Sequence, residues 1–160
     1  MITLLLTTLK EARYMIRNNC YLLILILMSF SIMPVSGQLY AAEQLKYRLL
    51  LQVSEDSVDK LNMALNNALS AVSSFGPQNI DVQLVVYGAG VQTLKYYAPF
   101  PIADKVRRAT TDGVRIVVSE RSMRAAKLRP SDMLEEVRYV PSGIVELVEK
   151  QTLGWSYVRP

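Results

Sequence analysis

Apolar segments with strand character alternate with amphipathic helical segments along most of this chain, and this alternation restricts the fold more than any other feature. The segment Tyr47 to Val53 (YRLLLQV) is typical of a buried strand, and the cluster Ser54-Glu55-Asp56-Ser57 after it offers N-cap residues. The next segment carries apolar side chains at steps of three and four residues, which predicts a helix with one buried stripe that ends at Gly76-Pro77. That stripe comprises Leu61, Ala64, Leu65, Ala68, Val72 and Phe75.

The same alternation continues through the middle of the chain. The residues Asp81 to Tyr87 and Val114 to Val118 predict a second and a third strand, and the apolar third strand is expected to lie centrally in the sheet. Between them, a polar and aromatic stretch and the breaker Pro99-Phe100-Pro101 precede a helix predicted from Ile102 to Thr111.

Shorter elements fill the last third of the chain. We expect a brief basic helix or turn from Ser122 to Leu128, a short helical piece at Ser131-Asp132 and a fourth strand from Val137 to Val140. Ser142 can cap a further helix that runs to Leu153. Its shared face comprises Ile144, Leu147, Val148 and Gln151. Residues Trp155 to Arg159 then predict a last strand at an edge of the sheet.

Strands that alternate with helices pair in parallel and place helices on both faces of the sheet. The chain therefore predicts an α/β fold: a three-layer α/β/α sandwich around a mostly parallel sheet of about five strands, Rossmann-like or flavodoxin-like in layout. Its 160 residues suffice for one such domain, which we place at residues 43–160.

Residues 1–42 have the three-part pattern of an export signal. Positive Arg17 follows a plausible start at Met15, the apolar stretch Cys20 to Met33 comes next, and small residues allow cleavage near Gly37 or Ala42. The apolar stretch falls short of the roughly 20 residues that span a bilayer. We therefore expect a periplasmic or secreted protein with no stable membrane span after cleavage. The alternative is an uncleaved anchor, which would make the domain a membrane-tethered structural subunit.

The only cysteine, Cys20, lies within this signal, and the chain has no histidine. The mature domain would then lack an imidazole base, a thiolate nucleophile, a disulfide and a thiolate metal site. Carboxylate spacing does not point to a metal or to acid-base catalysis, so we expect no metal, no cofactor and no catalytic residue. The net charge of +4 decreases when the basic signal is removed, which argues against nucleic acid as a partner.

Several short motifs follow the predicted strands and helices. They are Leu65-Asn66-Asn67, Val85 to Val91 (VVYGAGV), Asp112-Gly113-Val114, Val140 to Leu147 (VPSGIVEL), Gln151 and Gly154 to Pro160 (GWSYVRP). In these motifs residues 47–160 resemble the DsrE/DsrF-like family of small α/β proteins, which includes sulfur-relay carriers. The resemblance implies a DsrE-like fold, a link to sulfur-compound metabolism, and homo- or hetero-oligomers with DsrE-like subunits.

The chain departs from this family where chemistry is expected. Sulfur-carrying members have a reactive Cys in a pattern like Cys-x-Asn-Thr-Met, whereas this chain has Ser119-Glu120-Arg121-Ser122-Met123. Ser54 stands where many exported relatives have Asp, and Ser70 stands where a second helix Asn is expected. The resemblance thus implies a non-catalytic binding or assembly module. The alternative is a sulfur-handling enzyme or transferase that binds an anionic sulfur ligand non-covalently near Ser119 and Arg121.

Candidate ligand-binding residues are Ser119, Arg121, Ser122, Asn67 and Gly88. Ser119 ends a strand where open α/β sheets place their crevice. As a nucleophile it would need a base, and only Glu120 or Lys127 is near in sequence, so we favour a small polar residue satisfied at a strand end. Gly88-Ala89-Gly90 resembles a phosphate-binding turn, but Thr93 occupies the place of the third glycine, which favours a tight turn.

Two further surfaces are candidates for ligands or partners. The cations after the third strand could receive a small anion or an acidic partner surface, although nearby carboxylates favour an ordinary solvated face. These cations are Arg121, Arg124, Lys127 and Arg129, and the carboxylates are Glu120, Asp132, Glu135 and Glu136. For the exposed aromatic side chains we favour subunit contact. They are Tyr96, Tyr97 and Phe100 in one loop and Trp155 and Tyr157 near the C-terminus.

Overall fold

A computed structural model describes residues 46–160, so the predictions for the export signal lie outside the described residues. The order of elements is β1 (Tyr47–Val53), α2 (Val58–Phe75), β2 (Ile80–Val86), η1 (Gly88–Leu94), α3 (Phe100–Thr111), β3 (Arg115–Ser119), α4 (Glu120–Ala125), η2 (Pro130–Asp132), β4 (Arg138–Val140), α5 (Gly143–Thr152) and β5 (Ser156–Val158). The five strands form one sheet in the order β4-β3-β2-β1-β5.

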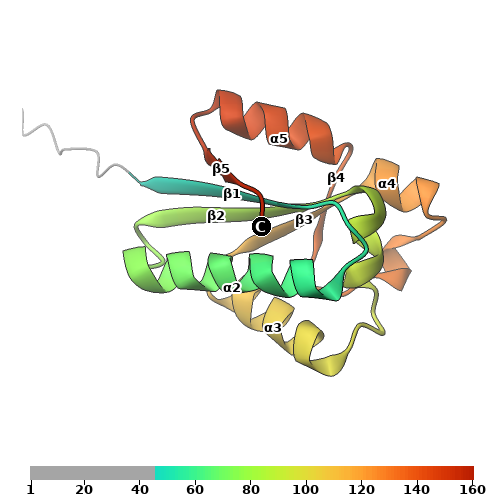
Figure 1. Cartoon of the computed structure of the whole chain (residues 1–160). Helices are drawn as coiled ribbons and strands as arrows, with labels where there is room; N and C mark the ends of the chain where they lie inside the picture. Colours follow the sequence, from blue (N-terminus) through green and yellow to red (C-terminus); the bar gives the residue numbers. More distant parts are fainter. Residues whose placement is uncertain (1–45) are drawn as a thin grey trace, which may run out of the picture. The chain divides into compact units, whose positions relative to one another are not determined.

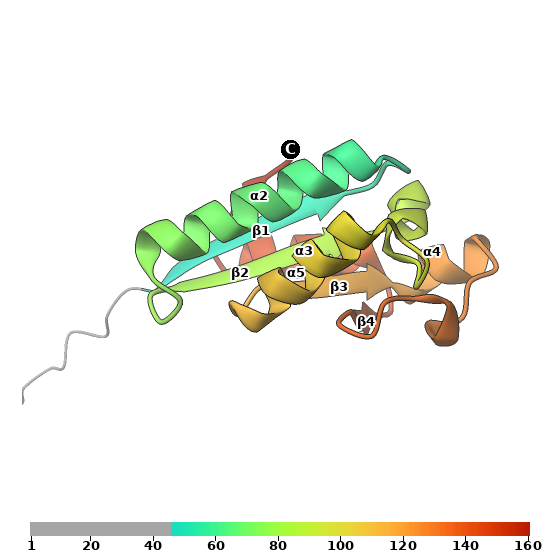
Figure 2. The same ribbon diagram turned by 90° about the horizontal axis from the view of Figure 1, so that it is seen from below.

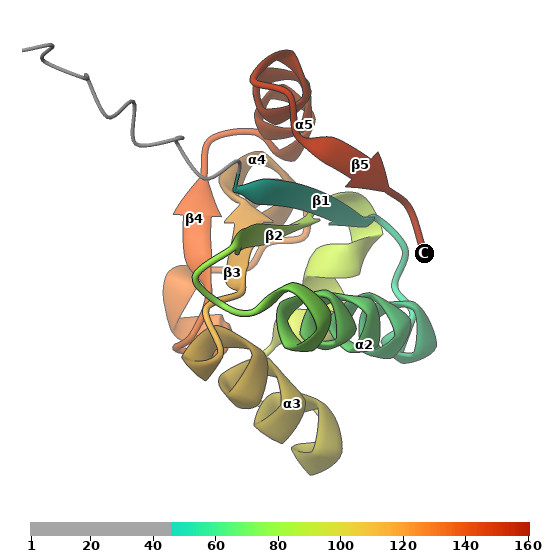
Figure 3. The same cartoon turned by 90° about the vertical axis from the view of Figure 1, so that its left-hand side faces the viewer.

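Every strand pair in this sheet is parallel, so the predicted α/β fold is confirmed and the sheet is more uniform than the expected mostly parallel one. Figure 1 shows α5 on one face of the sheet and α2 and α3 on the other. In the view from below, α2 and α3 lie side by side and run along the direction of the strands (Figure 2). β3 lies between β2 and β4, as expected for an interior strand, and β5 is an edge strand (Figure 3).

Helix α2 forms where its periodicity predicts, because its apolar side chains pack on the sheet. The Ser57 side chain accepts a hydrogen bond from the Lys60 amide and caps the helix, and Gly76 ends it with a φ of 84°. The predicted stripe is buried apart from its last member, since Phe75 is 43% exposed. Phe75 instead lies against the ring of Tyr47, the first residue of β1, with 4.4 Å between the ring centroids.

The two faces of the sheet bury very different amounts of apolar surface. The face under α2 and α3 carries the large core, which includes Leu61, Leu84 and Val118. The face under α5 carries a small one: Leu50, Val85, Val117, Leu147 and Trp155. The predicted shared face of α5 is wrong in part, because only Leu147 of its four members is buried. Leu147 faces the sheet, whereas the other three members lie on sides of α5 that no other described element covers.

Two local expectations are also corrected. Helix α3 begins at Phe100, two residues before the predicted start, because a proline in the first helical turn loses no hydrogen bond there. The Gly88-Ala89-Gly90 segment opens the 3-10 helix η1 instead of forming only a tight turn. Gly90 lies so close to the end of β1 that an added Cβ would stand 2.8 Å from the Val53 carbonyl oxygen, so this position requires glycine.

The last strand is held to the first by side chains as well as by strand pairing. The Tyr157 hydroxyl donates to Gln52 Oε1 at 2.5 Å, and Arg159 forms an ion pair with Glu55 at 2.9 Å. Lys60 Nζ donates to a Pro160 oxygen at 3.4 Å. Trp155 precedes β5 and is buried, so it does not supply the self-association surface expected of it. Within residues 46–160, no helix is long and apolar enough to cross a membrane.

Candidate functional site

All five strands end at the same side of the sheet, so the residues that follow them meet there. Ser119 is the last residue of β3 and is only 1% exposed. Its Oγ accepts a hydrogen bond from the Ser122 amide at 3.3 Å, which makes Ser119 the N-cap of α4. The strand end and the helix start are thereby joined through one hydroxyl.

Ser122 extends this network to the neighbouring strand. Its Oγ accepts a hydrogen bond at 2.8 Å from the Gly88 amide, just beyond β2. The structure therefore brings together three of the five candidate residues, Ser119, Ser122 and Gly88. Both hydroxyls accept hydrogen bonds from backbone amides that would otherwise have no acceptor. Such bonds stabilise the fold, so both serines have a structural role.

Replacing Ser119 by Ala should lower the free energy of unfolding by about 1 kcal/mol, since the α4 cap is lost. We expect assembly with partners to be unchanged. Urea unfolding followed by circular dichroism measures the first effect, with Ser74→Ala on the exposed surface of α2 as a control. A loss of partner binding by Ser119→Ala at intact stability would contradict the structural role.

Arg121 lies beside this network but takes part in it only through its backbone. Its amide donates to the Pro141 carbonyl oxygen at 3.2 Å, which joins the start of α4 to the loop before α5. The side chain is exposed and forms no ion pair within residues 46–160. The guanidinium is therefore available to a ligand or a partner.

Asn67 is not brought to the other candidates. It lies on the exposed surface of α2, which packs on the face of the sheet opposite to α5. Ser119 lies two residues after Val117 in β3, so the two side chains point to the same face of the sheet, and Val117 belongs to the core under α5. The two candidates thus lie on opposite sides of the sheet.

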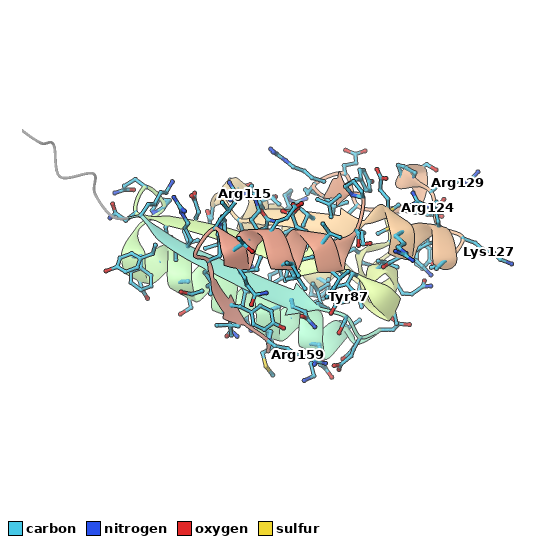
Figure 4. The ribbon with its side chains drawn as sticks, turned by 90° about the horizontal axis from the view of Figure 1, so that it is seen from above. Tyr87, Arg115, Arg124, Lys127, Arg129 and Arg159 are labelled. Carbon is cyan, nitrogen blue, oxygen red and sulfur yellow. The ribbon has the colours of Figure 1, made fainter. Side chains whose placement is uncertain are left out.

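The cations after β3 are compensated in part. Arg124 pairs with Glu120 at 3.6 Å and Arg129 with Asp132 at 3.4 Å, whereas Arg121 and Lys127 have no ion pair among the described residues. The Arg129 amide, and then its guanidinium, hold the pKa of the Asp132 carboxyl below its ordinary value of 3.8. Arg124, Lys127 and Arg129 gather at one end of the molecule (Figure 4).

Two features of the surface were not predicted from the sequence. A hollow of about 550 Å³ lies between α2 and α3, where Lys105 donates to the Asn62 and Asn66 side chains. Phe100 lines this hollow and is 76% exposed, and Tyr96 and Tyr97 before it are also exposed, so subunit contact through these aromatic side chains stays a prediction. No group of three or more potential metal ligands occurs among residues 46–160.

The second feature is an apolar surface on the outer side of α5. Ile144, Val145, Val148 and Leu153 are between 50% and 60% exposed, and we call these four residues the α5 stripe. Apolar surface of this kind on a helix often marks a protein contact. Periodicity could not reveal it, because α5 is apolar on the side that faces the sheet and on the side that faces outward.

The N-terminal end of the stripe is fixed by close packing. A Cβ added at Gly143 would stand 2.6 Å from Tyr87 Cβ and 3.0 Å from Tyr87 Cγ, so only glycine lets α5 approach β2 at this point. Tyr87 lies near the N-terminal half of α5 in Figure 4. The start of α5 is therefore held in place while its outer side chains stay exposed.

Solved structures of similar fold come from both archaea and bacteria. A protein of unknown function, MTH1491, from Methanobacterium thermoautotrophicum is 28% identical, with a TM-score of 0.66 over 72% of this chain and 100% of that one. BT1422 from Bacteroides thetaiotaomicron is 17% identical (TM-score 0.55; 71% and 94% covered), and the ychN protein from E. coli is 16% identical (TM-score 0.56; 71% and 97% covered). The last two similarities show the fold alone.

A comparison with curated proteins found no match. The model of the DsrE/DsrF-like family, in contrast, matches residues 48–160, which include all five strands except the first residue of β1. This match covers most of the chain and agrees with the observed all-parallel sheet. The chain therefore belongs to the DsrE/DsrF-like family.

Proposed function

We propose that this chain is a non-catalytic binding or assembly module, exported to the periplasm or secreted, that acts in sulfur-compound metabolism beside other DsrE-like subunits. The observation that carries this proposal is the α5 stripe, whose four aliphatic side chains are half or more exposed. Their burial against another subunit would gain roughly 25 cal/mol for each Å² of apolar surface removed from water.

The environment of Ser119 supports a role without covalent sulfur chemistry. By its resemblance to sulfur-carrying members, Ser119 occupies the position of their reactive Cys. Its hydroxyl is almost fully buried and already accepts a hydrogen bond from the Ser122 amide. A hydroxyl nucleophile also needs a base, and no side chain is hydrogen-bonded to Ser119 among the described residues.

Replacing Val148 by Asp should abolish assembly, because burying a carboxylate in the centre of the α5 stripe is costly when no opposite charge or hydrogen-bond donor compensates it. Native mass spectrometry of the protein from the extracytoplasmic fraction of its own organism measures the result, and also reports the cleavage point. Met63→Asp, on α2 at the other side of the sheet, is the matched control because Met63 is 48% exposed.

We expect the wild type and Met63→Asp to carry further DsrE-like subunits and Val148→Asp to be a monomer. An assembly that survives Val148→Asp would contradict the proposal, as would a monomeric wild type. Recovery of the chain only with detergent, at the mass of the uncleaved form, would instead support a membrane-tethered subunit.

A second candidate function is favoured by the unpaired Arg121. An anionic sulfur compound could bind its exposed guanidinium near Ser119 without a covalent bond. Calorimetric titration with thiosulfate tests this. Binding that Arg121→Gln removes would support the ligand site, and no heat of binding would leave assembly as the function.

A further inference from the structure

We propose that the α5 stripe binds a protein partner whose apolar surface is bordered by carboxylates, and not the α5 stripe of a second copy. This inference rests on the proposed function and specifies the partner of the same surface. Its basis is the distribution of charge around α5.

Four cations lie at the ends of α5, beside it or beyond its N-terminal end, and we call them the cationic frame: Arg48, Arg115, Arg121 and Lys127. Arg121 lies near its N-terminal end, since its amide donates to the carbonyl of Pro141. Arg48 lies at its C-terminal end, where Nη1 donates to the Leu153 carbonyl oxygen at 3.1 Å. Arg115 lies beside the helix, 5.4 Å from the centre of the Trp155 ring.

None of these four cations forms an ion pair within the described part of the chain. The seven ion pairs there join other cations to carboxylates. In the view onto α5, Arg115 lies to one side of the helix and Lys127 lies beyond its N-terminal end (Figure 4). The apolar stripe is thus bordered by cations that no carboxylate of residues 46–160 neutralises through an ion pair.

This distribution disfavours symmetric pairing of two α5 stripes. In a twofold contact the same surface meets itself. If the helices run antiparallel, Arg121 of one copy faces Arg48 of the other, and if they run parallel, Arg121 faces Arg121. Either arrangement brings like charges together beside a surface from which water is removed, and these charges repel each other. Carboxylates of a different partner, placed opposite the same arginines, would be attracted to them.

An anionic lipid surface fits the frame less well than a protein does. Glu149 is exposed and follows Val148 on the helix, so the outward side of α5 also carries a carboxylate. An anionic headgroup layer would repel it. A folded partner can place a donor opposite Glu149 and carboxylates opposite the frame.

Fluorescence anisotropy with two labelled helical peptides tests this proposal on the full chain produced without other DsrE-like subunits, so that no partner occupies the α5 stripe. Both peptides have 18 residues and the same leucine stripe. One has glutamates on both sides of the stripe, and the other has lysines at the same places. We expect the acidic peptide to bind at least tenfold more tightly, and the difference to shrink as salt is raised.

Variants test whether the cationic frame causes the preference for the acidic peptide. Arg121→Glu should reduce the preference severalfold, and Arg107→Glu, the same charge change on α3, should leave it unchanged. Val148→Asp should weaken binding of both peptides.

Equal binding of the two peptides, tighter binding of the basic one, or no binding of either would overturn the proposal. Binding to phosphatidylglycerol vesicles that exceeds binding to the acidic peptide would overturn it in favour of lipid.

The two proposals can fail separately. If Val148→Asp disrupts the native assembly but the peptides show no charge preference, assembly through α5 stands and only the acidic partner is refuted. If the native assembly survives Val148→Asp, the proposed function itself fails.

Discussion

Replacing Trp155 by Ala is expected to lower the free energy of unfolding by about 3–5 kcal/mol, the largest loss that a single substitution under α5 should cause. Trp155 is 8% exposed and belongs to the small core with Leu50 and Leu147. The Arg115 guanidinium and the Lys150 ammonium each lie 5.4 Å from the centre of its ring. The substitution removes the largest side chain of a five-residue core together with two cation-π contacts.

Urea unfolding measures this loss, and Leu153→Ala is the control, because Leu153 lies two residues away and is 60% exposed. We expect the control to change stability by no more than about 0.5 kcal/mol. A loss below about 1 kcal/mol for Trp155→Ala would show that the face under α5 contributes little to stability.

Replacing Gly143 by Val should cost about 3 kcal/mol, at the upper end of the cost of overpacking. The new Cβ would overlap Tyr87 Cβ, which belongs to the residue after β2 and cannot move away by a rotation of the side chain. Helix α5 would have to lift from the sheet, which would open the small core beneath it. Valine is also a poorer helix former than most residues, although better than glycine.

A pair of double variants identifies the clash in the same unfolding experiment. Tyr87→Ala keeps the overlapping Cβ, so the cost of Gly143→Val should persist in that background. Tyr87→Gly removes the Cβ and should recover most of the cost. Equal costs in all three backgrounds would place the clash elsewhere, and Ile144→Val, at an exposed neighbouring position, should have little effect.

The layered fold was predictable because its strongest patterns are local. The period of α2 and the Ser57 cap depend on neighbouring residues, and both are as predicted. Phe75, Ile144 and Val148 were misplaced because periodicity shows which side of a helix is apolar but not whether another element covers it. That coverage depends on how many helices lie on each face of the sheet.

The candidate site was predictable only in part. The position of Ser119 at a strand end followed from the alternation of strands and helices, but its partner did not. The bond from the Gly88 amide to Ser122 joins residues 34 apart in sequence, and no local pattern encodes it. Asn67 was grouped with Ser119 by family resemblance, although α2 carries it to the opposite side of the sheet.

The pairing of β1 with β5 has a consequence for biosynthesis. β1 is the first of the five described strands to be made, yet one of its two neighbours is the last of them, and the bond from Tyr157 to Gln52 spans 105 residues. Until β5 has been translated, the outer edge of β1 has unpaired amides and carbonyls that can recruit another nascent chain. Nascent chains that stall after α5 should therefore aggregate more readily than the completed protein, and a chaperone would be needed most during that interval.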